Sequence, residues 1–246
     1  MGELERLKTS IEKFGGQKIT EESLNKSILI YNKNRALLRK MYDIRRKRPG
    51  ILRSKEALSI VMSSMLMPKE EHNRLLEGFL GELEKQGPAG DAKVKLVLSG
   101  SLCQAPRLDI LDAIDEVGAV VVDDDLYVGS RYIITDAPLR ANPLESLADR
   151  FLEMRRRCPT KSDPENDWGG QLVEMVRESK ADGVISLQVK FCEACYFYHP
   201  DIIRALAGAG IPELRLEMEH ETTGMALGQI KTRVQGFIES ITGVGG

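Results

Sequence analysis

The chain has 246 residues, of which 42% are hydrophobic and 29% are charged, and this composition is that of an ordinary globular protein with a core of its own. No apolar run approaches the roughly 20 residues that cross a bilayer, and the charged start MGELERLKTS lacks the apolar stretch of a signal peptide. Four cysteines in a chain of this length do not suggest a secreted disulfide scaffold, so a reducing cytoplasm is the expected location.

Charge is distributed unevenly along the chain, although the formal net charge is only −2. Residues 1–90 carry 18 Lys and Arg against 12 Asp and Glu, whereas residues 91–246 carry 17 against 25. The basic part has no interleaved aromatic residues and no nucleic-acid-binding motif, so nucleic acid is not an expected partner. Its densest run, RRKR at residues 45–48, could meet phosphates or an acidic surface. The favoured interpretation is a solvated helix end that complements the helix dipole.

The first third of the sequence predicts helices only. Thr20 has the position of an N-cap, with two glutamates in the turn that follows it. Helices are predicted over residues 3–14, 21–47, 54–66 and 68–85. The stretch QGPAG at residues 86–90 has the composition of a linker, which predicts a helical segment over 1–90 and an α/β domain over 91–246. The helical segment needs the α/β part, or a partner, to bury its apolar stripes.

The second part of the sequence alternates between apolar strands and amphipathic helices. Strands are predicted at residues 94–98, 119–122, 183–189 and 214–218. Helices are predicted at residues 106–117, 143–157, 168–180, 200–209 and 224–241. This order predicts the α/β class, with a four-stranded doubly wound parallel sheet preceded by an all-helical segment.

Polar loops follow the first two predicted strands, and ligands of open parallel sheets bind outside the carboxyl ends of strands. Cys103 lies in the first loop, and DDD at residues 123–125 opens the second. The candidate substrate-binding residues are Ser99, Gly100, Ser101, Gly129, Ser130 and Arg131. Neither loop matches a P-loop or a dinucleotide fingerprint, so neither nucleotide hydrolysis nor a dinucleotide site is predicted. Arg131 and Arg233 are candidates for anion binding, and structural ion pairs are the equal alternative.

The third predicted strand is followed by Cys192 and Cys195, whose C-x-x-C spacing lets two sulfurs reach one metal. A metal site and an incidental pair of cysteines are equal alternatives. A thioredoxin-like dithiol is disfavoured, because that motif follows the first strand of its own fold. Cys158 is expected to be a small buried hydrophobic residue, and His199 and His220 are expected to be structural.

Four stretches of the sequence carry a family resemblance. The two longest are GSLCQAPRLDILDAIDEVGAVVVDDDLYVGSRY at residues 100–132 and ADGVISLQVKFCEACYFYHPDIIRALAGAGIPELRLEMEHETTGMALGQIKTRVQGFIES at residues 181–240. They resemble the central and C-terminal segments of the 2-hydroxyacyl-CoA dehydratase D-component and benzoyl-CoA reductase family. CPTKSDP at 158–164 and ITEESLNKSILIYNKNRALLRKMYDIRR at 19–46 also fit the family pattern, so the resemblance covers nearly the whole chain.

The resemblance implies a subunit of an oxygen-sensitive lyase or ring reductase that binds acyl-CoA and carries a [4Fe-4S] cluster. It also implies two protein partners, a second homologous subunit and an ATP-hydrolysing activator iron–sulfur protein that delivers a low-potential electron. In the family this electron passes through the cluster to the thioester carbonyl. A ketyl radical anion then eliminates the hydroxyl group, or an aromatic ring is reduced. Thiolate ligation and burial keep the potential of such a cluster low.

Three features of this chain depart from the family pattern. Tyr127 stands in DDLY, where the family usually has a cysteine ligand. Residues 1–91 contain no cysteine, although the family has a further ligand in an N-terminal α/β domain, so the chain is expected to be the C-terminal portion of a longer subunit. Only Cys192 matches a family ligand directly, and Cys195 and Cys103 are the expected substitutes.

These departures leave two hypotheses. The chain is either a truncated or split dehydratase or reductase component that is not active alone, or a cluster-free, non-catalytic partner or assembly subunit of the same descent.

Overall fold

The computed structural model describes residues 1–87, 94–100, 108–154, 167–218 and 224–243. The helices in these ranges are α1 (Gly2–Gly15), α2 (Glu21–Lys47), α3 (Ser54–Leu66), α4 (Lys69–Lys85), α5 (Leu108–Glu116), α6 (Ser130–Ile133), α7 (Pro143–Leu152), α8 (Trp168–Ser179), α9 (Glu193–Gly208) and α10 (Gly224–Thr242). The strands are β1 (Val94–Gly100), β2 (Ala119–Asp125), β3 (Gly183–Val189) and β4 (Glu213–Met218). None of the helices described is long and apolar enough to cross a membrane.

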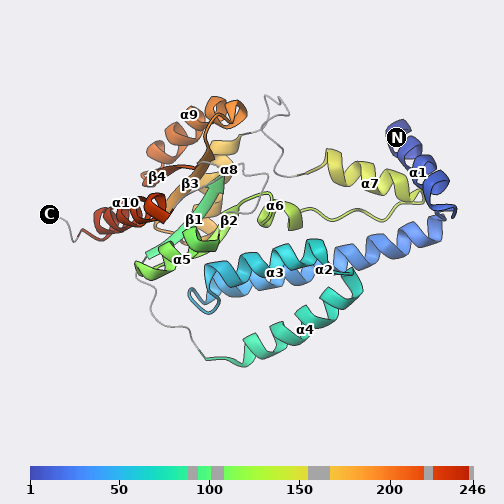
Figure 1. The fold of residues 1–246 in the computed structure, drawn as a ribbon, viewed down its shortest axis with the longest axis horizontal. Helices are drawn as coiled ribbons and strands as arrows, with labels where there is room; N and C mark the ends of the chain where they lie inside the picture. The colour runs from blue at the N-terminus through green and yellow to red at the C-terminus, as the bar shows by residue number, and fades with distance from the viewer. Residues whose placement is uncertain (88–93, 101–107, 155–166, 219–223, 244–246) are drawn as a thin grey trace.

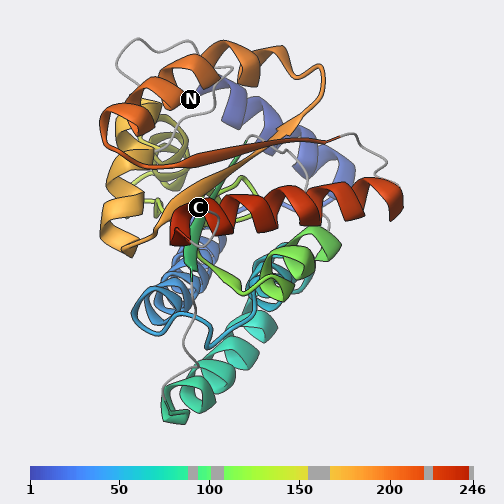
Figure 2. The same cartoon turned by 90° about the vertical axis from the view of Figure 1, so that its left-hand side faces the viewer.

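The strands form one parallel sheet in the order β2-β1-β3-β4, with helices on both faces. One face carries α5, which packs on β2, and α10, which packs on β1 and β4, and Figure 2 shows the strands between α10 and α9. The other face carries α8 and α9, which pack on β1 and β3. The predicted α/β fold with a four-stranded parallel sheet is confirmed.

Helices α2, α3 and α4 form the lower layer in Figure 1 and share an apolar cluster of their own. Leu58 of α3 belongs to the cluster of the sheet, and Ile133 of α6 belongs to the cluster of the helices. The helical segment therefore buries part of its apolar surface against the α/β part. Whether residues 1–90 also form a separate domain stays a prediction.

Several predicted boundaries agree with the structure, and others do not. Thr20 is the N-cap of α2, since its side-chain oxygen accepts a hydrogen bond from the N–H of Ser23 at 3.1 Å. The prediction that a helix begins at Pro200 is wrong, because α9 begins at Glu193 and contains the proline in its interior. Cys192 is the N-cap, and its carbonyl accepts a hydrogen bond from the N–H of Cys195 at 3.0 Å. The C-x-x-C pair therefore belongs to a helix start and not to a loop.

A polar contact, here called the α2–β2 seam, fastens the C-terminal half of α2 to the edge strand β2. It consists of Tyr42, Arg45 and Arg46 on α2 and Val121, Asp123 and Asp124 on β2. The Tyr42 hydroxyl donates to Asp124 at 2.6 Å, and Arg46 Nη1 lies 2.6 Å from Asp123. Burial raises the pKa of Asp124, and this effect outweighs the positive charge of Arg45, which lowers the pKa.

Arg45 lies at the centre of the seam and is only 4% exposed. Its Nη2 donates to the carbonyl oxygen of Val121 at 2.7 Å, and its Nη1 lies 4.0 Å from Asp124. A guanidinium group therefore covers part of an edge strand, whose backbone would otherwise be open to pairing with another chain. The interpretation of residues 45–48 as a solvated helix end is wrong at Arg45, since the acids of β2 and its backbone draw this side chain into the interior.

The segment between α6 and α7 is held against α2 by a second group of polar contacts. Asn32 exchanges two hydrogen bonds with the backbone of Ala137, at 2.8 and 3.0 Å. Asp136 lies 3.1 Å from Arg35 Nε and 2.6 Å from Arg39 Nη2. Burial alone would raise the pKa of Asp136, but the hydrogen bonds and charges of the two arginines outweigh it, so the pKa is lowered.

The seam predicts a large effect of Arg45→Met on stability. The substitution keeps most of the side-chain volume but leaves the Val121 carbonyl unsatisfied and the buried carboxyl group of Asp124 without its cation. We expect the free energy of unfolding to fall by about 3 kcal/mol, measured by urea denaturation. Lys47→Met in the same basic run is the matched control, because Lys47 is exposed. Equal losses in the two variants would contradict a structural role of Arg45.

Asp136 predicts a pH-dependent contribution to stability. Its folded pKa lies below the ordinary value of about 3.9, so its contribution is complete above that value and is lost as the pH falls through the lowered folded pKa. We expect urea denaturation to show wild type more stable than Asp136→Asn at pH 6, and the difference to shrink as the pH approaches 3. A difference that stays constant over this range would contradict the assignment.

Candidate functional site

The order of the strands locates the crevice that an open parallel sheet offers to ligands. The chain runs from β1 to the edge strand β2 and then returns to β3 on the other side of β1. The connections therefore leave the sheet in opposite directions at β1 and β3, and ligands bind outside the carboxyl ends of the strands at such a switch point. The residues to consider are Ser99 and Gly100 at the end of β1 and the turn between β3 and α9.

Gly100 lies opposite Leu187 in the register of β1 and β3. A side chain on Gly100 would start far inside van der Waals contact with the backbone carbonyl of Leu187, and its φ of 156° is rarely adopted by other residues. The glycine of the SGS sequence is thus required by the close approach of two strands. Ser99 is buried beside it, whereas the predicted site residues Ser101 and Cys103 lie outside the described residues.

The acids that follow the second apolar run belong to the strand and not to a loop, because β2 extends through Asp125. Asp123 and Asp124 are buried in the α2–β2 seam. Asp124 Oδ1 also accepts a hydrogen bond from the N–H of Ser130 at 2.9 Å, and it occupies the space that a side chain on Gly129 would need. The glycine of the VGSR sequence therefore makes room for an internal carboxylate.

Arg131 is only 1% exposed and forms a two-pronged ion pair with Asp125, at 2.9 Å from Nε and 2.7 Å from Nη2. Its guanidinium carbon lies 4.7 Å from the ring centroid of Tyr127 and 4.4 Å from that of Trp168. Tyr127 thus covers one side of a buried cation. Arg233 Nη2 donates to the carbonyl oxygen of Arg215 on β4 at 2.7 Å.

The two cysteines of the C-x-x-C sequence lie together at the start of α9. Cys192 Sγ and Cys195 Sγ are 3.0 Å apart, so the two sulfurs are in direct contact at the start of the helix. Cys192 is partly exposed, and Cys195 is buried. Among the residues described, no three His, Cys, Asp or Glu side chains are grouped so that they could hold a metal ion. His220 and Cys158 lie outside these residues.

A buried polar row, not anticipated from the sequence, runs along the face of the sheet beneath α8 and α9. Ser99 lies opposite Ser186 in the register, and Gln188 lies two residues further along the same face of β3. Glu213 accepts a hydrogen bond from Ser186 and lies 2.8 Å from Nε2 of His199 on α9. The sequence contains one sign of this row, because serine and glutamine interrupt strands that are otherwise apolar.

Gln188 differs from the other members of the row. It is buried, and within the described part of the chain its Oε1 has no hydrogen-bond partner. A buried amide oxygen without a partner costs free energy, and such a group in a native protein calls for an explanation such as a ligand. Its position near the end of β3, just before the cysteine pair, makes it a candidate ligand contact.

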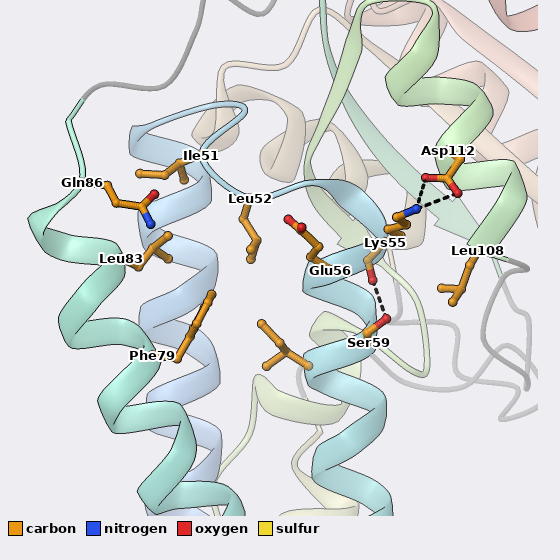
Figure 3. A pocket seen from close by; sticks show the side chains of 11 residues that line it. Ile51, Leu52, Lys55, Glu56, Ser59, Phe79, Leu83, Gln86, Leu108 and Asp112 are labelled. Carbon is orange, nitrogen blue, oxygen red and sulfur yellow. Dashed lines mark hydrogen bonds and ion pairs between the residues drawn. The ribbon is translucent and has the colours of Figure 1, made fainter.

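A hollow lies away from the strand ends, between α3, α4 and the start of α5. It has a volume of about 810 Å³ and is lined by Ile51, Leu52, Lys55, Glu56, Ser59, Ile60, Phe79, Leu83, Gln86, Leu108 and Asp112. Figure 3 shows Lys55 directed at Asp112, to which it lies 2.8 Å away, and Glu56 Oε2 accepts the N–H of Arg53 at 2.9 Å. These charges are engaged within the chain, so the hollow offers mainly apolar contact area.

Comparison with known proteins agrees with the family pattern of the sequence. Residues 1–241 match the model of the family described as 2-hydroxyglutaryl-CoA dehydratase, D-component. A benzoyl-CoA reductase subunit of Thauera aromatica is 28% identical over 97% of this chain and 62% of its own length. The (R)-phenyllactyl-CoA dehydratase beta subunit of Clostridium sporogenes is 30% identical over 94% of this chain and 60% of its own length.

A third relative is the beta subunit of (R)-2-hydroxyglutaryl-CoA dehydratase of Acidaminococcus fermentans, which is 29% identical over 96% of this chain and 62% of its own length. The chain thus spans 60% to 62% of the length of these three relatives.

Substitution by alanine is expected to have opposite effects on stability at two glycines, because only Gly100 lies against a neighbouring strand. Gly100→Ala introduces a methyl group against the Leu187 carbonyl, and we expect a loss of about 2 kcal/mol in the free energy of unfolding. Gly78→Ala, on an open face of α4, is expected to gain about 0.5–1 kcal/mol. Urea denaturation of the two variants checks both signs. A Gly100→Ala variant as stable as wild type would show that the two strands do not lie so close.

Proposed function

The chain belongs to the 2-hydroxyglutaryl-CoA dehydratase D-component family, and from this premise we propose that it is a subunit, or part of one, of an enzyme of the 2-hydroxyacyl-CoA dehydratase or benzoyl-CoA reductase type. The three relatives described above are each named as a subunit. We therefore expect a second homologous subunit as a partner. An activator iron–sulfur protein and an acyl-CoA substrate are the further partners that this proposal includes.

The observation that carries the proposal at the level of residues is the cysteine pair at the switch point of the sheet. Cys192 and Cys195 are the first two proposed ligands of a [4Fe-4S] cluster, and each would bind a different iron after their sulfurs move apart from the present 3.0 Å. Cys103, which follows β1 in sequence, is the third proposed ligand. When bound, such a cluster supplies one-electron chemistry at low potential. The chain's own contribution is to hold two thiols together at the start of a helix that is anchored on the sheet by His199 and Glu213.

The substrate is proposed to lie between the ends of β1 and β3. There Ser99 lies in register with the buried polar row, next to Gly100 at the end of β1. The buried Oε1 of Gln188 can accept a hydrogen bond from a hydroxyl or amide group of a ligand. Ser130 and Arg131, by contrast, are engaged with Asp124 and Asp125. Their proposed part is to keep the neighbouring end of β2 in place.

One observation favours the alternative of a cluster-free partner or assembly subunit. Tyr127 occupies the position of a family cysteine, and its ring lies against the guanidinium group of Arg131. A thiolate is thereby replaced by a side chain that stabilises a buried ion pair. The two proposals differ in one measurable property, the ability of the protein to hold iron and sulfide.

Iron and sulfide analysis after anaerobic reconstitution tests the cluster proposal. We expect wild type to bind about four iron and four sulfide per chain with a charge-transfer absorption band, and Cys192→Ser and Cys195→Ser each to lose most of both. Cys158→Ser is the matched control and is expected to keep the cluster. Circular dichroism of each variant shows whether the fold is intact.

Two results would contradict the ligand assignment. A wild-type protein that stays colourless and free of iron would favour the cluster-free alternative. A Cys103→Ala, Cys195→Ala double variant with normal cluster content would exclude these two residues as ligands.

A further inference from the structure

An unusual group of cations lies where α2 meets α4, α6 and α7. Its members are Arg35, Arg39, Lys69 and Arg150. Arg35 and Lys69 are 4% and 6% exposed, so both are effectively inside the protein. In the described part of the chain, Asp136 is the one carboxylate that forms an ion pair with any of the four. Within the described residues, Arg35 and Arg39 thus share one carboxylate, and Lys69 and Arg150 form an ion pair with none.

The contacts of Lys69 and Arg150 are to neutral groups. Lys69 Nζ donates to the hydroxyl of Tyr132 at 2.8 Å and to the carbonyl of Ser64, and it lies 5.0 Å from the ring centroid of Tyr31. Arg150 donates to the carbonyls of Thr135 and Tyr132, both at 3.1 Å. Oxygens and aromatic rings solvate these cations but do not neutralise them. A buried lysine without a carboxylate is rare, because its desolvation is only partly compensated.

A cavity of about 210 Å³ opens beside this group of cations, between α2 and α7. These two helices lie side by side at the end of the molecule that is far from the sheet (Figure 1). Its lining includes Tyr31, Arg35 and Arg150, and the remainder is mainly apolar, with Leu24, Ile28 and Leu147. Burial, and after it the nearby charge of Arg150, lower the pKa of Arg35 against the raising effect of Asp136.

We propose that this cavity binds a small anion with an apolar body, of the class of short-chain carboxylates. The anion would lie between the guanidinium groups of Arg35 and Arg150, where a carboxylate can accept hydrogen bonds from both. The chain of the ligand would lie against the leucine and isoleucine side chains. The volume is below the roughly 300–1,000 Å³ of sites for drug-sized molecules, so a whole acyl-CoA does not fit. The site is thus separate from the one proposed at the strand ends and does not depend on the family's chemistry.

The competing explanation is that the arginines serve the fold alone. Arg39 and Arg150 both donate to carbonyls at the end of α6, where cations complement the helix dipole. That role accounts for two of the cations and for their positions. It does not account for the cavity that Arg35 and Arg150 line. A structural role predicts no ligand binding, so the two explanations separate in a binding experiment.

Isothermal titration calorimetry with hexanoate tests the proposal. We expect saturable binding of one hexanoate per chain, weaker binding of acetate because it lacks the apolar body, and none of 1-hexanol because it lacks the charge. Arg150→Gln is expected to weaken hexanoate binding about tenfold or more, since it removes a charged hydrogen-bond donor. Arg140→Gln is the matched control, because Arg140 is an exposed arginine paired with Asp149 and does not line the cavity. We expect it to bind like wild type.

A second variant tests the cavity without changing its charge. Ser27 is exposed and lines the cavity, so Ser27→Trp is expected to obstruct it without disturbing the core and to weaken hexanoate binding. The unfolding midpoint of each variant without ligand shows whether the fold is kept. The proposal is overturned if hexanoate does not saturate, if Arg150→Gln and Arg140→Gln bind it equally, or if 1-hexanol binds as well as hexanoate. It is also overturned if folded Ser27→Trp binds hexanoate like wild type.

Discussion

The α2–β2 seam is the contact on which the arrangement of this chain depends. It joins a basic helix to an acidic strand through the buried side chains of Arg45 and Asp124, and it closes one edge of the sheet at the carbonyl of Val121. A buried ion pair contributes little net stability, but it tolerates only one register, because a shift of either element leaves a charge without its partner. In this region, the excess of basic residues in the first part of the sequence and of acidic residues in the second thus holds α2 against β2.

The seam also determines where a ligand can bind. Because Asp123 and Asp124 are engaged with α2, and Asp125 with Arg131, the carboxyl end of β2 is occupied by internal contacts. On β3, by contrast, the buried side-chain oxygen of Gln188 has no partner in the described residues. The cysteine pair lies at the start of α9, the helix that follows this strand. Chemistry is therefore expected beside β3 and not in the row of acids that the sequence displays most prominently.

Much of this fold could be predicted from the sequence, because local patterns carry it. The apolar runs of the strands, the N-cap at Thr20 and the alternation of strands with helices are read within a few residues of one another. The seam could not be predicted, because its partners lie far apart in the sequence: Tyr42 and Asp124 are 82 positions apart. No local pattern indicates which residue of α2 contacts which acid of β2. The start of α9 was missed because a proline, here Pro200, usually marks the first turn of a helix and not its interior. The polar row was missed because a buried serine or glutamine in a strand acquires meaning only from the strand beside it.

The arginines of α2 are paired with carboxylates differently in two parts of the helix. Near its C-terminus, Arg45 and Arg46 meet Asp123 and Asp124, so cations and anions balance within the chain. Around the middle of the helix, Arg35 and Arg39 share the carboxylate of Asp136, with further cations from α4 and α7 close by. A cavity adjoins this middle stretch, with Arg35 and Arg150 in its lining, and the proposed carboxylate would supply a negative charge there from outside the chain. Beside Arg45 and Arg46, by contrast, the acids of β2 already supply the negative charge.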